Sequence, residues 1–460
     1  MSLLVFVAGP SLGAQPLRIA SGWSPDDHRG AVHRTASLSP TSAALVASGL
    51  VLGSRGRARR QRTVARQPNR TTRQFFGNLF GPEEVIDPDD PGRVGVCKEY
   101  QSMPGTVVAA EESEFGWAVV SKHEASEQDG HWIGEAPGEV SQEWRELRLA
   151  KTSTRSRPGS AEGTGQSVVK VSLCEGAPPQ QVPYCMALAY TKSLCAAALT
   201  GAHVQEALPL DAIPSQRALV IGLGAGSIPL WLEHTFPAEK MRVDALEIDP
   251  AVVKVATEEM GFPKEAVRPS KTAQEAGKDA VSNTEALRVY LVPGEDFVEA
   301  LASQSDAYKY DMVFIDAFDK AGKVPPVLVD GEGTFLQSLS QVLAPKATVV
   351  LNLLVGMTGT GSCGGPQEIE AMVTSIQKTC CNASSEIFTI RTPISESSGN
   401  QLYGFLRAGR SDRSKPLKEA LKESAEMVNA DFPKDSLGQK IRFDLARRVV
   451  FSYQDWPKKN

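Results

Sequence analysis

The chain has 460 residues, 41% hydrophobic and 22% charged, which is a globular composition with room for two domains. The formal net charge is −5, but residues 81–460 carry 38 Lys and Arg against 52 Asp and Glu. A body this acidic argues against broad affinity for nucleic acid or anionic membranes. The seven Cys are irregularly spaced without a Cys-x-x-Cys pair, so we expect reduced thiols and no metal site.

Residues 1–80 contain eleven Arg, no Lys and two acids, and we treat them as a targeting or disordered segment. Two short apolar stretches, the second followed by an Arg cluster, resemble a bipartite plastid leader, and a disordered basic tail is the alternative. We expect a plastid location, with the cytoplasm or the mitochondrion as alternatives. No apolar stretch of the chain reaches the about 20 residues that a membrane span needs.

Residues 81–175 are predicted to be a linker followed by a small antiparallel β domain. The β-rich runs cover 106–110, 117–120, 144–149 and 167–171, and a Ser-Glu-Phe-Gly turn joins the first two. Apolar residues at helical spacing then predict a helix from Pro183 to Ala202.

Residues 176–410 alternate buried strands with helices, which predicts a doubly wound α/β sheet. The expected parallel strands are 218–221, 241–247, 287–292, 310–315 and 347–354, and 387–391 and 402–406 could close the sheet as an antiparallel pair. A polar insertion fills about 264–286. Residues 411–460 are expected to form a C-terminal helical tail.

Chemically informative residues follow these strands. Gly222, Gly224 and Gly226 come directly after the first strand and before a helix, and glycines there let backbone approach a nucleotide-like ligand. Glu247 ends the next strand, where a carboxylate can accept both ribose hydroxyls. Asp316 ends the fourth strand. Because ligands of such sheets bind beyond the carboxyl ends of the strands, we expect these residues to share one site.

Two cofactor classes fit this turn poorly. The glycine spacing differs from the Gly-x-Gly-x-x-Gly of nicotinamide dehydrogenases, and no Gly-x-x-x-x-Gly-Lys of nucleoside triphosphate sites occurs. S-adenosylmethionine fits better, because its sulfonium needs no phosphate cradle. Asp249 followed by Pro250 has a simpler explanation, as the N-cap of the next helix.

These motifs together resemble class I S-adenosylmethionine-dependent methyltransferases of the spermidine-synthase-like group. The matching stretches are 219–227, 246–250, 289–297 and 310–319. The chain looks most like the C-terminal half of the dual methyltransferases that modify translation elongation factor 1A. The resemblance implies a Rossmann-like seven-stranded methyltransferase sheet, a small N-terminal antiparallel β domain and a homodimer.

The resemblance also implies roles for individual residues. The three turn glycines would line the amino-acid end of S-adenosylmethionine, and Glu247 would hold its ribose. Ile248 and Gly294 would complete the cofactor site. Asp316 would sit beside the transferring group, and Asp319 would match an acid that contacts the acceptor amine.

Two departures from the group separate the alternatives. Polyamine synthases carry an Asp where this chain has Ala225, and the missing carboxylate favours methyl transfer to an amine of a protein or small molecule over aminopropyl transfer. The group usually has an Asp where this chain has Pro293, and Asp296 could replace it only in a rearranged loop. A polyamine aminopropyltransferase and a non-catalytic binding protein with this fold therefore stay as alternatives.

Overall fold

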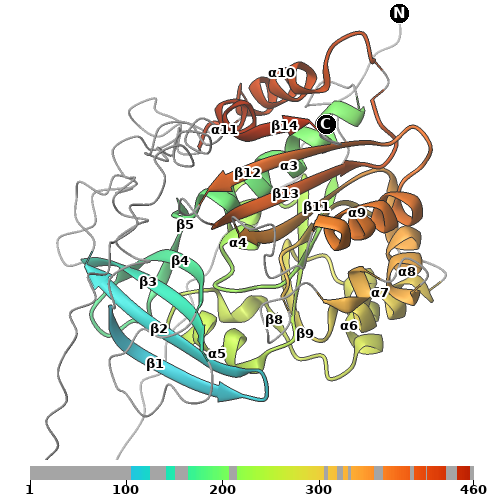
Figure 1. Ribbon diagram of the computed structural model, residues 1–460. Helices are drawn as coiled ribbons and strands as arrows, with labels where there is room; N and C mark the ends of the chain where they lie inside the picture. The colour runs from blue at the N-terminus through green and yellow to red at the C-terminus, as the bar shows by residue number, and fades with distance from the viewer. Residues whose placement is uncertain are drawn as a thin grey trace, which may run out of the picture. The chain divides into compact units, whose positions relative to one another are not determined.

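The computed structural model describes residues 105–124, 141–150, 164–206, 215–304, 309–318, 325–329, 333–356, 366–393, 398–410, 412–430, 432 and 443–455. All of them belong to one compact unit, Asn69–Asn460. Its framework is a small antiparallel sheet and a large mixed sheet with helices on both faces (Figure 1). The predicted leader, 1–80, lies outside the described residues and stays a prediction, as do the domain boundaries.

In the described part of the chain, the small sheet has five antiparallel strands in sequence order. They are β1 (Thr106–Ser113), β2 (Gly116–Glu124), β3 (Ser141–Ala150), β4 (Thr164–Leu173) and β5 (Gln180–Met186). The β1–β2 turn closes where Ser113 pairs with Gly116, as predicted. The predicted small β domain is therefore confirmed.

The helix predicted from Pro183 was placed too early. Pro183 lies in β5, which pairs with β4, and helix α3 spans Ala189–Glu206. Short apolar runs such as this one fit both strand and helix periods. Antiparallel pairing with β4, the preceding strand, makes this segment a strand.

The large sheet has the order β14-β12-β13-β11-β10-β6-β7-β9-β8 among the described strands. Its central strands β6 (Gln216–Ile221), β7 (Met241–Glu247), β9 (Leu287–Leu291), β10 (Tyr310–Ile315) and β11 (Leu343–Gly356) are parallel. The pair β12 (Glu386–Pro393) and β13 (Ser398–Leu406) is antiparallel, as predicted. The doubly wound fold is confirmed, and short strands β8 (Val267–Arg268) and β14 (Tyr453–Asp455) extend the predicted seven strands at the two edges.

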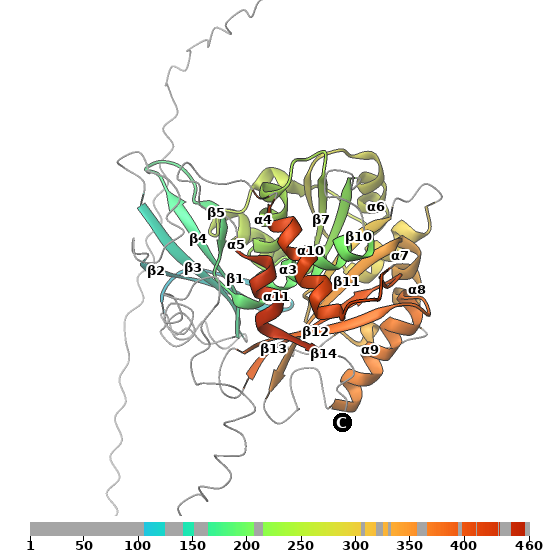
Figure 2. The ribbon, with the colours of Figure 1, turned by 90° about the horizontal axis from the view of Figure 1, so that it is seen from above.

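Side chains of the central strands alternate between two cores, as expected for strands buried on both faces. On β6, Ala218 and Val220 join the core formed with helices α3, α4 (Ser227–Thr235), α10 (Leu417–Ala430) and α11 (Leu445–Ser452). Leu219 and Ile221 join the core with α6 (Ala273–Ser282), α7 (Gly294–Ala302), α8 (Thr334–Val342) and α9 (Pro366–Cys380). Figures 1 and 2 show these two helix groups on opposite faces of the sheet. Helix α5 (Pro250–Glu258) instead packs mainly against the small sheet.

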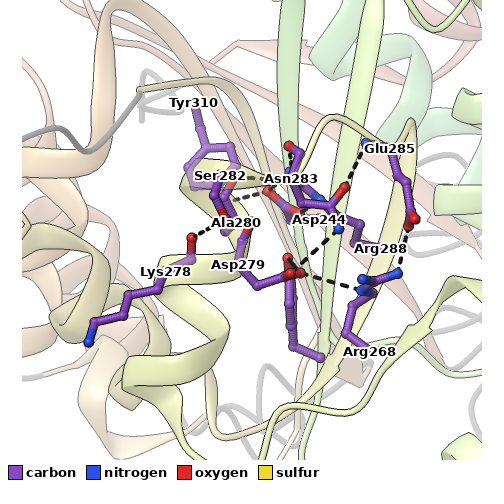
Figure 3. A network of polar contacts seen from close by, with 11 residues as sticks. Asp244, Arg268, Lys278, Asp279, Ala280, Ser282, Asn283, Glu285, Arg288 and Tyr310 are labelled. Atoms are coloured by element: carbon purple, nitrogen blue, oxygen red, sulfur yellow. Dashed lines mark hydrogen bonds and ion pairs between the residues drawn. The ribbon is translucent and has the colours of Figure 1, made fainter.

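The predicted polar insertion contributes α6, which a buried ion pair attaches to the sheet (Figure 3). The Arg288 guanidinium donates to both carboxylate oxygens of Asp244, Nε to Oδ1 at 2.7 Å and Nη2 to Oδ2 at 3.0 Å. Its Nη1 donates to the carbonyls of Ala280 and Asn283 at the end of α6, at 3.1 and 2.6 Å. Tyr310 also donates to Asp244, at 2.8 Å. Satisfied hydrogen bonds of this kind offset the cost of burying both charges.

The C-terminal tail folds back onto α3 through α10 and α11. Trp231 of α4 stacks on Phe443 with ring centroids 5.1 Å apart and meets Phe432 edge-on. β14 then pairs with β12. Within the described ranges, no helix is both long and apolar enough to span a membrane.

Candidate functional site

The carboxyl ends of the central strands bring the predicted site residues to one edge of the large sheet. The Gly222 N–H donates to the carbonyl of Leu246 on β7 at 2.9 Å. The Asp316 N–H donates to the carbonyl of Ile221 on β6, also at 2.9 Å. The loops after β6, β7 and β10 are therefore adjacent, as the parallel order of the strands requires.

The glycine turn between β6 and α4 has the conformation that the sequence suggested. Gly222, Gly224 and Gly226 have positive φ values of 99°, 55° and 77°, which residues with a Cβ atom rarely adopt. A Cβ on them would lie 2.3 Å from the Asp316 carbonyl oxygen, 2.5 Å from Ser167 Oγ and 2.1 Å from the Phe262 ring, respectively. The glycines thus let three other segments pack directly against the turn.

Glu247 connects the tip of β7 to the glycine turn. Its Oε2 accepts the Leu223 N–H at 3.0 Å, and its Oε1 accepts the N–H groups of Ile248 and Asp249 at 2.9 and 3.0 Å. Burial raises the pKa of Glu247, and the three N–H groups partly offset that rise. A carboxylate has about four acceptor positions, so one stays available for a ligand hydroxyl, rather than the two expected from the sequence for a ribose.

Asp316 lies just beyond β10 and is held by a neighbouring strand. Its Oδ1 accepts from the Asn352 amide on β11 at 2.7 Å, and Tyr190 of α3, whose hydroxyl donates to the Gln166 carbonyl, lies close to the same carboxylate. Burial raises the pKa of the Asp316 carboxyl, while the neighbouring polar groups of Asn352 and Tyr190 act in the opposite direction. A desolvated carboxylate fixed in this way can attract an ammonium group and accept a proton from it.

The polar contacts continue from Asp316 into the antiparallel part of the sheet. The Asn352 side-chain carbonyl accepts from the Asn400 amide on β13 at 2.9 Å. Both Asn residues are buried. Asn400 Oδ1 has no hydrogen-bond partner among the described residues. A buried acceptor without a partner is costly, and a ligand N–H group could satisfy it.

The loop after β9 borders the other side of the edge. Gly294 begins α7, and a Cβ there would lie 2.9 Å from Ile221 Cγ2, so glycine permits close helix packing. Ile248 is 45% exposed and offers an apolar surface at the tip of β7. Pro293 and Asp296 line a hollow of about 600 Å³ together with Lys271. Neither Glu247 nor the turn glycines line this hollow, so the replacement of the usual Asp at 293 by Asp296 stays a prediction.

The remaining predicted residues are placed as follows. Asp249 is the N-cap of α5, as expected, accepting from the Ala251 N–H at 2.8 Å, and it also accepts from the Ser113 hydroxyl at 2.9 Å. Asp319 lies outside the described residues, so its role stays a prediction. In the part of the chain that is described, no cluster of His, Cys, Asp or Glu could hold a metal ion.

Ala225 has a more definite environment than its sequence position suggested. The residue is 0% exposed, and its methyl group packs in an apolar cluster with Ala118 and Val120 of β2 and Ala251 of α5. This position is therefore part of the contact between the glycine turn and the small sheet. A carboxylate there would be buried against apolar side chains.

Curated relatives match part of the chain, although no family model matches it. The human eEF1A lysine and N-terminal methyltransferase is 29% identical over 216 residues, covering 44% of this chain and 25% of that protein. The polyamine aminopropyltransferase of Vibrio vulnificus (strain CMCP6) is 32% identical over 137 residues, covering 30% of this chain and 37% of that protein. The predicted family resemblance is confirmed. The chain is similar to methyltransferases of the spermidine-synthase-like group.

The extent of the similarity is limited. The chain spans between 25% and 37% of the length of these two relatives. Among solved structures, human Methyltransferase-like protein 13 in complex with SAH matches 59% of this chain and 96% of that chain, with 22% identity and a TM-score of 0.37.

Four residues that the structure places at the site were assigned no site role from the sequence. Tyr190 lies in the segment predicted to be a buried helix, and Ser167 lies in a predicted strand of the small domain. Asn352 and Asn400 each had a signal that could have been used: each is a polar residue in or next to a strand-like apolar run. A buried amide inside a sheet needs partners, and here the partners form the site.

Proposed function

We propose that this protein is an S-adenosylmethionine-dependent methyltransferase that transfers a methyl group to an amine of a protein or small molecule. The observation that carries the proposal is the contact of Glu247 with the glycine turn, on the same sheet edge as Asp316. A carboxylate that could bind a ribose, a turn that permits close approach and a second, buried carboxylate therefore lie on adjacent loops. The similarity to named methyltransferases supports the same conclusion.

The described residues fit S-adenosylmethionine. The free acceptor position of Glu247 suits a ribose hydroxyl, and the exposed Ile248 side chain suits a flat apolar adenine. Gly294 would border the same end, and Gly222, Gly224 and Gly226 would line the amino-acid end. When bound, the cofactor supplies an electrophilic methyl group on a sulfonium.

The protein's own residues would prepare the acceptor. Methyl transfer is an in-line displacement that needs a neutral amine in the correct position. The Asp316 carboxylate would attract the ammonium form and take its proton, for which a raised pKa is favourable. The Asn352 amide would hold that carboxylate in place. Asn400 Oδ1 is an acceptor that could orient an amine N–H group. Asp319, by its resemblance, would contact the same amine.

A polyamine aminopropyltransferase is the second candidate, because a protein of that name is 32% identical over 137 residues. Ala225 argues against it. The carboxylate that grips the aminopropyl arm in that group has no counterpart here, and the Ala225 methyl group is fully buried among apolar side chains. An ammonium-bearing arm next to this position would remain unpaired, at a cost of several kcal/mol.

The acceptor is proposed to be a protein amine. The human relative is named for methylation of a lysine and an N-terminus of eEF1A, so eEF1A is the first acceptor to test. Transfer of labelled methyl from S-adenosylmethionine to purified eEF1A should be compared with transfer to a polyamine. Modification of the polyamine alone would contradict a protein acceptor.

The cofactor is tested by calorimetric titration of the full chain with three ligands. We expect S-adenosylmethionine to bind more tightly than its decarboxylated form or methylthioadenosine. Preference for the decarboxylated form would overturn methyl transfer in favour of aminopropyl transfer. A folded protein that binds none of the three would instead be a non-catalytic member of the fold. An Asp316→Asn variant should keep cofactor binding and lose transfer.

Two further parts of the proposal concern assembly and location. We propose a homodimer, supported by the resemblance to the spermidine-synthase-like group, and light scattering on the purified chain measures its mass directly. We also propose that residues 1–80 direct the protein to a plastid, supported by their Arg-rich, acid-poor composition. Microscopy of a fluorescent fusion in a plastid-bearing cell tests the second point.

A further inference from the structure

Strand β4 of the small sheet lies directly against the proposed site. Two consecutive residues of β4 contact different parts of the site: Gln166 lies on the Asp316 side, and Ser167 lies against the glycine turn. The Gln166 carbonyl accepts from the Tyr190 hydroxyl at 3.0 Å, and Tyr190 in turn contacts Asp316. The Ser167 hydroxyl accepts from the Ala225 N–H of the glycine turn at 3.1 Å. The small sheet therefore supplies part of the site's wall.

Two contacts place the Ser167 hydroxyl oxygen against the glycine turn. Gly224 leaves room for it, since a Cβ at 224 would lie 2.5 Å from Ser167 Oγ. The oxygen uses a lone pair to accept the Ala225 N–H. That bond does not use the hydroxyl proton, and among the described residues Ser167 Oγ donates no hydrogen bond. A half-buried donor is thus presented beside the turn.

We propose that Ser167 is a specificity-determining residue, whose hydroxyl donates to the α-carboxylate of S-adenosylmethionine. This inference rests on the proposed function and names the part of the cofactor that the small sheet recognises. The glycine turn is where the amino-acid end of the cofactor would lie, and a carboxylate is the acceptor that a free hydroxyl there would suit best. The decarboxylated cofactor lacks this acceptor and would leave the hydroxyl unsatisfied.

The charge pattern of the turn agrees with this assignment. Ala225 contributes a methyl group that faces the small sheet, so the turn has no carboxylate to repel a ligand carboxylate. Ser167 is neutral and can only donate or accept a hydrogen bond. A site that hydrogen-bonds a ligand group discriminates strongly against an analogue that lacks this group, because the site's polar group is left without a partner. An apolar pocket discriminates much less when an analogue only loses apolar contact. Discrimination between the two cofactors would therefore depend on β4, outside the large sheet.

The test measures affinities of the full chain for S-adenosylmethionine and its decarboxylated form, in wild type and Ser167→Ala. We expect Ser167→Ala to weaken binding of S-adenosylmethionine by about 10-fold to 100-fold, as for a lost hydrogen bond to a charged group. Affinity for the decarboxylated form should change by less than about twofold. Ser172→Ala, on the same strand but away from the glycine turn, is the matched control and should change neither.

Other outcomes would overturn the inference. Equal weakening of both ligands would mean that Ser167 only supports the turn through Ala225, and unchanged affinities would mean that it touches no ligand. If Ser167→Ala does not fold, Ser167→Cys keeps the side-chain volume with a weaker donor, and the same ratio is measured. Wild-type protein that binds neither cofactor would instead refute the proposed function, so the two failures are distinguishable.

Discussion

Glu247→Gln is the sharpest test of how the site is built. The substitution keeps the size of the side chain but replaces one carboxylate oxygen by an NH2 donor. In the wild type, Oε1 accepts two N–H groups and Oε2 accepts the Leu223 N–H. The least disruptive orientation of the new side-chain amide keeps its oxygen at the Oε1 position and puts its NH2 group opposite the Leu223 N–H. Two donors then face each other, so one hydrogen bond to a charged group is lost. Such a bond contributes about 1.5–3 kcal/mol.

Stability and binding should respond differently to this change. Burial raises the pKa of Glu247, which shows that the charged form has a desolvation cost that Gln avoids. The loss of unfolding free energy should therefore fall below that range, at about 1 kcal/mol. Cofactor affinity should fall by about 10-fold to 100-fold, because the turn and the ribose acceptor are both altered. Calorimetry measures the affinity, and urea unfolding measures the stability.

The pH dependence gives an independent check on Glu247. Its pKa in the folded protein is raised, so the folded state binds more protons than the unfolded state between the two pKa values. The free energy of unfolding therefore decreases as pH rises through that interval, and Glu247→Gln should remove this contribution. Glu233→Gln, on the surface of α4 with a bond to His234, is the control. A folded Glu247→Gln protein with unchanged cofactor affinity would refute the placement of the ribose.

Three further substitutions test the surroundings of the site. Asn352→Leu removes the donor to Asp316, so the pKa of Asp316 should rise further and the acid limb of the rate profile should move to higher pH; an unmoved limb would exclude Asp316 as the titrating group. Arg288→Met leaves Asp244 buried without its cation and should cost about 3–5 kcal/mol in urea unfolding, whereas a loss below about 1 kcal/mol would contradict a buried pair. Gly226→Ala combines left-handed strain with overlap on Phe262 and should cost about 2–5 kcal/mol by thermal unfolding, unless the ring can move aside.

The sequence by itself determined the framework of the site. Buried strands that end in glycine or acid specify which residues lie at the carboxyl edge, because parallel strands all end on the same side. Gly222, Gly224, Gly226, Glu247 and Asp316 were found in this way, and adjacent loops now contain them. The apolar periods of the chain also specified the doubly wound sheet and the small β domain.

The tertiary structure decided which residues complete that edge. Ser167 and Ala225 are 58 residues apart, and Asn352 and Asn400 are 48 apart, so no local pattern links them. The end of β5 and the ion pair that holds α6 likewise depend on partners from other strands. A local period reports only whether a side chain faces water or the core, whereas a hydrogen bond needs a partner that only the folded chain brings within about 3 Å.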